Sequence, residues 1–185
     1  MKRVLLVASI LLISVVSTAC INSFAVQELN TKAKSLMDNG DYQSAVERLK
    51  SSIDLDSSVY ESYYNLAVAY TKLDDYLNAF ESYKKVIELK PDFADGYYSL
   101  AVCEENLITD LEEGTLIADE NGNLSKPEEI ETEHTIDANS KAYIKTLTAD
   151  AVANYEKYLS KAENPQDKDT VEERIAELNS KAVEE

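Results

Sequence analysis

The chain has 185 residues, enough for one domain and a targeting segment. Its apolar share of 44% is ordinary for a folded protein, and four glycines and three prolines are few, as expected for a mostly helical chain. The formal net charge of −17 repels phosphate backbones and so argues against nucleic-acid binding. The same charge would attract a basic partner, although it can also serve solubility alone.

The chain begins with the pattern of an export signal. Lys2 and Arg3 precede an apolar run over 4–16. This run of 13 residues matches the apolar region of a secretory signal peptide, and it is shorter than the about 20 residues of a membrane-spanning helix. Residues 1–19 are therefore predicted to be a signal peptide, and residues 20–28 a short tether.

Two cleavage sites compete at the end of the apolar run. Residues 16–20 read VSTAC, which resembles a bacterial lipobox with Ser17 where that family prefers leucine. The resemblance implies that Cys20 carries a lipid and anchors an exported protein to the cell membrane or the outer membrane. The alternative is an ordinary signal-peptidase site, and cleavage before Val26 would release a periplasmic or secreted protein.

A period of 34 residues organises the middle of the chain. Residues 63–70 read YYNLAVAY and residues 97–104 read YYSLAVCE, so both tyrosines and the LAV run coincide one period apart. A second pattern has the same spacing, since Ala45 recurs as Ala79. Self-similarity at this period is typical of a repeated pair of helices. The middle of the chain is therefore predicted to be a stack of helix pairs.

The spacing within one unit predicts which side chains pack together. Tyr63, Leu66 and Tyr70 fall at i, i+3 and i+7, which is one face of a helix. The small side chains of Ala67 and Ala79 let the two helices of a pair approach closely. Turn and capping residues separate the helices, and a proline after the second helix stops it from continuing.

These residues resemble the tetratricopeptide repeat, whose pattern is W-x2-L-G-x2-Y, then A-x3-F, then P. The unit over 60–93 has Tyr, Ala and Tyr in place of the Trp, Gly and Phe. The resemblance implies an all-α solenoid of helix-turn-helix pairs, with about three repeats and a C-terminal capping helix. It also implies a non-catalytic scaffold or adaptor. The matching residues are Tyr63, Leu66, Ala67, Tyr70, Ala79, Tyr83 and Pro91.

An acidic insert interrupts the third repeat. Ala101 and Ala151 are 50 residues apart, whereas the equivalent Ala67 and Ala79 are 12 apart, so the insert adds 38 residues. Inserts of this length are usually functional or disordered. The predicted organisation is repeats one, two and the first helix of repeat three over 29–107, a partly disordered insert over 108–141, and the second helix of repeat three with the capping helix over 142–183.

The residue patterns do not favour catalysis, a cofactor or a metal site. The single histidine, His134, lies in the acidic insert without an apolar frame, which favours a solvated loop residue. Asp and Asn alternate over 119–123 as in a calcium loop. However, Leu124 and Ile130 stand where an EF-hand needs glycine and glutamate. The chain is therefore interpreted as a protein that is not an enzyme.

The predicted binding site is the concave surface that the resemblance implies along the first helix of each pair. Tyrosine suits a peptide partner because it offers a large contact area at low entropic cost. The partner is expected to be a protein or peptide with a basic or apolar segment, in the bacterial cell envelope. The same side chains could instead pack against the next helix or under the insert. The predicted groove residues are Lys34, Tyr64, Val68, Lys72, Tyr98 and Val102.

Two other functions stay open at this point. The insert could fold over the groove and build a small-molecule or metal site, as in an enzymatic accessory protein, and ligands that raise the melting temperature would favour that function. The repeats could also mediate self-association. A clamp for a C-terminal carboxylate, found in some members of the family, is not expected because Asp95 and Ser99 stand where lysine and arginine are wanted.

Overall fold

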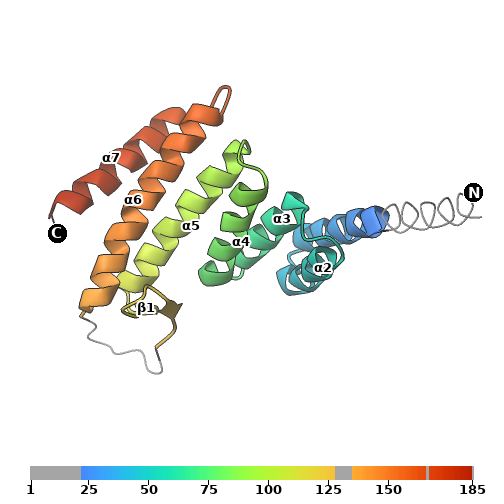
Figure 1. The fold of residues 1–185 in the computed structure, drawn as a ribbon, viewed down its shortest axis with the longest axis horizontal. Helices are drawn as coiled ribbons and strands as arrows, with labels where there is room; N and C mark the ends of the chain where they lie inside the picture. Colours follow the sequence, from blue (N-terminus) through green and yellow to red (C-terminus); the bar gives the residue numbers. More distant parts are fainter. Residues whose placement is uncertain (1–21, 128–134, 166, 185) are drawn as a thin grey trace, which may run out of the picture. The chain divides into compact units, whose positions relative to one another are not determined.

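The computed structural model describes residues 22–127, 135–165 and 167–184. The chain divides into two compact units, Met1–Leu73 and Asp74–Glu185 (Figure 1). The predicted signal peptide, Cys20 and His134 lie outside the described residues. Residues 22–38 are helical, so the predicted tether is helix from residue 22 onward. Over the described ranges, none of the helices is long and apolar enough to cross a membrane.

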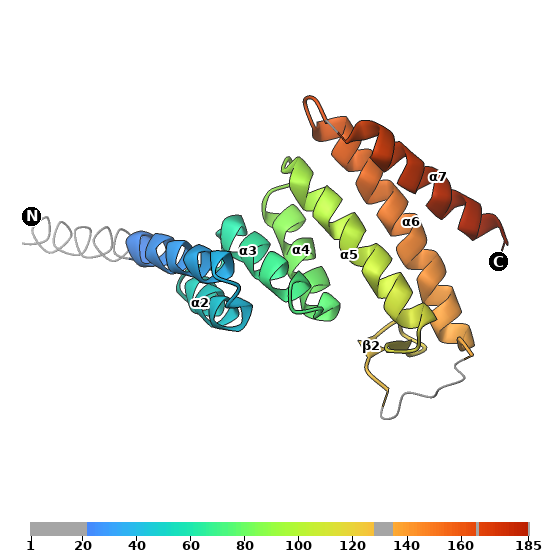
Figure 2. The same cartoon turned by 180° about the vertical axis from the view of Figure 1, so that it is seen from behind.

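The described part of the first unit contains the helix over 22–38, α2 (Tyr42–Leu55) and α3 (Tyr60–Thr71) (Figure 2). Short connections join these helices, which makes consecutive helices antiparallel neighbours. Asp41 begins α2 by accepting a hydrogen bond from the backbone N–H of Ser44 at 3.1 Å. Small and branched apolar side chains fill the space between the helices. Those with no exposed surface are Ala33, Ala45, Leu49, Ala67 and Ala69.

A buried polar junction ties the three helices of this unit together. The Asn30 side-chain amide donates to the hydroxyl oxygens of Ser52 and Ser62, each at 2.8 Å. The two hydroxyls are 3.0 Å apart and fully buried, so their polar groups are satisfied inside the unit. The Asn65 amide also donates to Asn30 Oδ1 at 3.4 Å, which places α3 beside the helix over 22–38.

The described part of the second unit contains α4 (Tyr76–Leu89), α5 (Ala94–Glu112), α6 (Ala138–Lys161) and α7 (Lys168–Glu184). Helix α5 packs against α4 and α6, and α7 packs against α6. The predicted all-α architecture of helix-turn-helix pairs is confirmed, and α7 buries its apolar face as expected of a capping helix. The buried cluster that α5, α6 and α7 share includes Tyr97, Ala101, Ala151, Tyr155, Val171 and Leu178.

The helices on both sides of the insert are longer than the sequence predicts. Helix α5 continues past residue 107 to Glu112, and α6 begins at Ala138 rather than at 142. Apolar side chains account for the extension of α5, because Ile108 and Leu111 continue its buried stripe by one more turn. The remaining insert is correspondingly shorter, and its residues 128–134 lie outside the described part of the chain.

The described part of the insert holds a β-hairpin that the sequence did not predict. Strands β1 (Ile117–Ala118) and β2 (Leu124–Ser125) pair antiparallel. The turn between them is held by Asp119, whose Oδ1 accepts the backbone N–H groups of Asn121 and Asn123, both at 2.8 Å. The carboxylate is thus occupied with fixing the turn.

The hairpin is anchored on the N-terminal end of α6. The backbone N–H of Ala118 donates to Ser140 Oγ at 3.1 Å, and the Ser140 hydroxyl donates to Asp137 Oδ2 at 2.6 Å. At the tip, a Cβ at Gly122 would lie 3.1 Å from Cε2 of Tyr143, so the tyrosine ring packs directly on the glycine backbone. The hairpin therefore has a defined place on the second unit.

Candidate functional site

In the first unit, Lys34 lies on the helix over 22–38, Tyr64 and Val68 lie on α3, and Lys72 directly follows α3. Lys34 and Lys72 are exposed, whereas Tyr64 and Val68 are half-buried. The hydrogen bond between Asn65 and the helix over 22–38 brings these two helices side by side. Lys34 follows Asn30 by one turn and Val68 follows Asn65 by nearly one turn, so these two predicted residues lie next to the contact between the helices.

In the second unit, the predicted residues Tyr98 and Val102 lie on α5 and pack against the buried cluster of α5, α6 and α7. The Tyr98 ring centroid is 5.8 Å from that of Tyr155 and 5.1 Å from that of Tyr158. Such edge-to-face and tilted arrangements are favourable for aromatic pairs. The two residues are half-buried, so each contributes to packing as well as to the surface.

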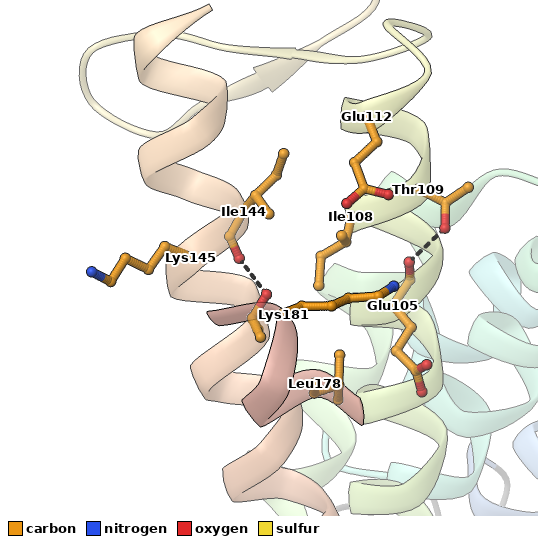
Figure 3. Close-up of a pocket in the computed structure, with 9 residues that line it drawn as sticks. Glu105, Ile108, Thr109, Glu112, Ile144, Lys145, Leu178 and Lys181 are labelled. Atoms are coloured by element: carbon orange, nitrogen blue, oxygen red, sulfur yellow. Dashed lines mark hydrogen bonds between the residues drawn. The ribbon is translucent and has the colours of Figure 1, made fainter. Parts of the chain in front are cut away.

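The stripe that begins with Tyr98 and Val102 continues along α5 through Glu105, Thr109 and Glu112. These positions are separated by steps of four and three residues, which keeps them on one face of the helix. The last three line a pocket of about 80 Å³ between α5, α6 and α7 (Figure 3). The predicted surface therefore ends in a concave site that the sequence did not reveal.

The pocket combines an apolar floor with a charged rim. Ile108, Ile144 and Leu178 contribute buried side chains, one from each of the three helices. Exposed Lys145 and Lys181 stand on the rim, and Lys181 extends from α7 across the pocket toward α5 in Figure 3. Over the described residues, neither lysine takes part in an ion pair within 4 Å, so both are available to a ligand.

Two threonines offer hydrogen-bond acceptors inside the pocket. The Thr109 hydroxyl donates to the backbone oxygen of Glu105 at 3.1 Å, and the Thr148 hydroxyl donates to that of Ile144 at 2.9 Å. Each hydroxyl thereby uses its hydrogen within its own helix. Its oxygen lone pairs remain able to accept from a bound molecule.

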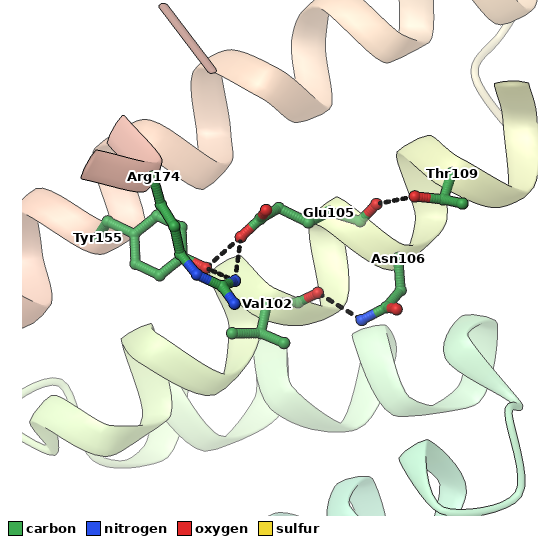
Figure 4. A network of polar contacts seen from close by, with 6 residues as sticks. All are labelled: Val102, Glu105, Asn106, Thr109, Tyr155 and Arg174. Carbon is green, nitrogen blue, oxygen red and sulfur yellow. Dashed lines mark hydrogen bonds and ion pairs between the residues drawn. The ribbon is translucent and has the colours of Figure 1, made fainter. Parts of the chain in front are cut away.

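A polar network holds the carboxylate at one side of the pocket. The Tyr155 hydroxyl donates a short hydrogen bond to Glu105 Oε1, and Arg174 Nη1 donates to the same oxygen at 2.8 Å and to the Tyr155 hydroxyl at 3.0 Å (Figure 4). Burial, and then the hydrogen bond to the Glu105 carboxylate, raise the pKa of Tyr155. The network therefore joins α5, α6 and α7 around a fixed negative charge.

A second carboxylate lies behind this network, in the core. Glu104 is only 2% exposed, and the side-chain amide of Asn154 donates to its Oε1 at 3.0 Å and its Oε2 at 2.9 Å. Burial raises the pKa of Glu104 to about 8, because removal from water disfavours the charged form. At neutral pH this side chain is therefore mostly a neutral acid.

Sequence reasoning missed several of these residues, although one signal was present. Glu104 stands where Tyr70 stands one period earlier, so a charged residue occupies a position of the buried stripe. Such a position calls for a buried partner, which the structure identifies as Asn154. Arg174, Lys145 and Lys181 gave no comparable signal, because each is a common surface residue of a polar helix.

The described residues include one thiol, which lies in the core. The Cys103 thiol is buried and donates to the backbone oxygen of Tyr76 at 3.4 Å. Burial raises the pKa of Cys103, which keeps the sulfur protonated and poorly nucleophilic. Over the described ranges, no group of three or more His, Cys, Asp and Glu side chains is arranged to hold a metal ion. The hairpin contributes none of the residues around the α5, α6 and α7 pocket.

The comparison with protein families identifies one repeat. The tetratricopeptide repeat model matches residues 60–93, which is the unit that carries the resemblance in the sequence. This match spans α3, α4 and the turn after them. No curated protein matches the chain.

Solved structures with the same fold are numerous, and three illustrate their range. The TPR domain of Arabidopsis OM64 has a TM-score of 0.60 at 14% identity, covering 84% of this chain and 98% of that one. The TPR2B domain of yeast Sti1, in a complex with pHsp70, has a TM-score of 0.59 at 15% identity, with coverage of 85% and 98%. The Yersinia enterocolitica translocator chaperone SycD of type III secretion has a TM-score of 0.56 at 14% identity, with coverage of 88% and 86%. At these identities the likeness concerns the fold.

Proposed function

We propose that this chain is a non-catalytic protein-binding module that holds a segment of a partner protein along the first helices of its repeats. The observation that carries the proposal is the stripe on α5, which leads from half-buried Tyr98 to the pocket between α5, α6 and α7. The fold supports it, because similar folds include a domain solved with pHsp70 and a chaperone of secretion translocators.

The pocket at the end of the stripe suits one side chain of a partner. Its volume of about 80 Å³ is well below the roughly 300 Å³ at which small-molecule sites begin. An apolar side chain would bury against Ile108, Ile144 and Leu178. Polar groups beside that side chain would meet the Thr109 oxygen and the Lys181 ammonium. A segment with an apolar anchor next to polar atoms therefore fits this end of the surface best.

Site-specific photocrosslinking in the native host tests this surface. A benzophenone amino acid placed at Tyr64, on the predicted stripe of the first unit, or at exposed Thr109, beside the pocket, should give the same covalent adduct with one partner. Matched positions are exposed Glu47 on α2 and exposed Glu156 on α6, which belong to second helices of the pairs and lie off the proposed surface. These two should give no adduct with that partner.

The pattern of adducts decides the outcome. Equal yields at all four positions, or adducts from Glu47 and Glu156 alone, would contradict binding along the first helices. A shared adduct from Tyr64 and Thr109, lost when Lys181→Glu reverses the charge on the pocket rim, would locate the partner segment in the pocket.

We also propose that the protein is exported and anchored in the cell envelope through a lipid on Cys20. The support lies in the sequence, where a small-residue VSTAC segment follows an apolar run that is too short to span a membrane. A labelled lipid precursor should enter the wild-type chain, and the chain should sediment with membranes. Cys20→Ser should abolish both. Unlabelled wild-type protein released into the periplasm or medium would instead point to cleavage before Val26.

A further inference from the structure

A second and larger pocket lies between α4, the hairpin and α6. Its volume is about 290 Å³, and it shares no lining residue with the pocket at the end of the α5 stripe. Leu77 and Phe80 of α4, Leu124 of β2 and Tyr143 of α6 supply its apolar walls. This volume is close to the lower limit of about 300 Å³ for small-molecule sites, which suits one long side chain.

The walls of this pocket are fixed before any ligand arrives. The hairpin is bonded to α6 through Ala118 and Ser140, and its turn is held by the Asp119 carboxylate. The tip approaches Tyr143 so closely that only a glycine fits at position 122, where φ is +78°. A preformed site loses less conformational entropy on binding than one that must be ordered.

Two side-chain amides, those of Asn78 and Asn123, line this pocket and are held by neighbouring carboxylates. The side-chain amide of Asn78 donates to Asp75 Oδ2 at 2.7 Å, and that of Asn123 donates to Asp119 Oδ2 at 2.8 Å. Each amide thus uses one of its two N–H groups on a carboxylate, and it keeps its carbonyl oxygen as an acceptor and its second N–H group as a donor. The Glu81 carboxylate stands on the same rim. This carboxylate can only accept hydrogen bonds, so it favours a ligand that donates them.

The electrostatic surroundings are negative as well. The pKa of the Tyr143 phenol is raised, first by burial and then by the charges of Glu81 and Asp150. One of the chain's own cations already occupies the neighbouring position. Lys84 Nζ lies 4.9 Å from the centroid of the Phe80 ring and 3.2 Å from Glu81 Oε1. An aromatic face beside a carboxylate is a combination that attracts cations.

From these contacts we infer that the pocket binds an arginine side chain of a basic segment in a protein partner. The arginine stem lies along Leu77, Leu124 and Tyr143, and its planar guanidinium reaches the Glu81 carboxylate and the Phe80 face. The guanidinium displaces Lys84, whose side chain is half exposed and whose pair with Glu81 is therefore weak. The inference goes beyond the proposed function, because it places a second contact away from the first-helix surface.

Titration of the purified chain with two short peptides tests the inference by nuclear magnetic resonance. The probes are acetyl-Leu-Arg-Leu-amide and the same peptide with neutral, nearly isosteric citrulline. The arginine peptide should shift the backbone amides of Gly122, Asn123 and Leu124 in a saturable way. The citrulline peptide should bind about tenfold more weakly, since charge-assisted hydrogen bonds are roughly twice as strong as neutral ones.

Three substitutions on α4 make the test specific. Glu81→Gln should weaken binding of the arginine peptide about fivefold. Lys84→Gln should strengthen it about twofold, because it frees both the carboxylate and the ring. Glu88→Gln is the matched control: Glu88 pairs with Lys85 at the same i, i+3 spacing and should leave the affinity unchanged.

Several results would overturn the inference. Glu81→Gln and Glu88→Gln could lose the same affinity for the arginine peptide, or the citrulline peptide could bind as tightly as the arginine peptide. Lys84→Gln could bind the arginine peptide more weakly than the wild-type chain does. The amide shifts could also be confined to the α5 stripe. None of these results bears on the adducts expected at Tyr64 and Thr109, so this site and the proposed function can fail separately.

Discussion

Glutamine at position 104 should stabilise the protein at pH 8 and remove the stability loss that ionisation of Glu104 is expected to cause in the wild-type protein between pH 5 and pH 8. The reason is the buried Glu104 carboxyl, whose pKa is raised to about 8 from a model-peptide value of 4.5. Between these two values the folded state keeps a proton that the unfolded state releases. As the pH rises through this window, the free energy of unfolding therefore falls by about 1.4 kcal/mol for each pH unit. Below the window, Glu104 is protonated in both states and its full contribution to stability is present.

Urea denaturation followed by far-ultraviolet circular dichroism at pH 5, 6.5 and 8 measures this effect. Glu104→Gln keeps the size of the side chain and can still bond Asn154, but it has no proton to release in this range. Glu156→Gln, at an exposed position of α6, is the control that removes one carboxylate without changing the core. If the Glu104→Gln chain lost stability with pH as steeply as the control, Glu104 would not be the group responsible.

Alanine at position 155 should lower the free energy of unfolding by about 3–5 kcal/mol, the range for removing a large aromatic side chain from a core. Tyr155 has no exposed surface, and its ring packs against Tyr98. Its hydroxyl is also part of the network with Glu105 and Arg174. The substitution therefore leaves a cavity where α5, α6 and α7 meet.

Tyr155→Phe distinguishes the contribution of the ring to stability from that of the hydroxyl. It keeps the packing and removes the hydroxyl alone, while the ion pair between Arg174 and Glu105 at 2.8 Å remains. Its expected loss is about 1.5–3 kcal/mol, the range for hydrogen bonds to charged groups, since the hydroxyl bonds both Glu105 and Arg174. Urea denaturation measures both variants. A loss for Tyr155→Phe as large as that for Tyr155→Ala would show that the polar network, and not ring packing, holds the three helices together.

The helix pairs could be predicted from the sequence because the signal is local. Leu66, Ala67 and Tyr70 are spaced so that they lie on one face of a helix, and all three are buried in the structure. Asp41 and Asp75 cap the helices that follow them, since each side chain accepts a backbone N–H three residues on. Such features depend on neighbours within a few residues, so the linear pattern is enough to predict them.

The pockets and the polar network could not be predicted because they depend on contacts between distant residues. Glu105 is 50 residues from Tyr155 and 69 from Arg174. The hairpin was missed for a different reason. Its strands have two residues each, too few to show the alternation that marks a strand, and its place is set by hydrogen bonds to α6. The composition of the insert pointed to a loop and carried no information about that docking.

The Cys103 sulfur, held against the backbone of α4, gives the chain a reporter of its own movements. A thiol reagent reaches this atom only when α4 and α5 separate far enough to admit it. The alkylation rate of Cys103 in the native state therefore measures how often α4 and α5 separate, without an engineered residue. Comparing the alkylation rate with and without a bound partner segment would show whether binding makes the opening between α4 and α5 rarer or leaves its frequency unchanged.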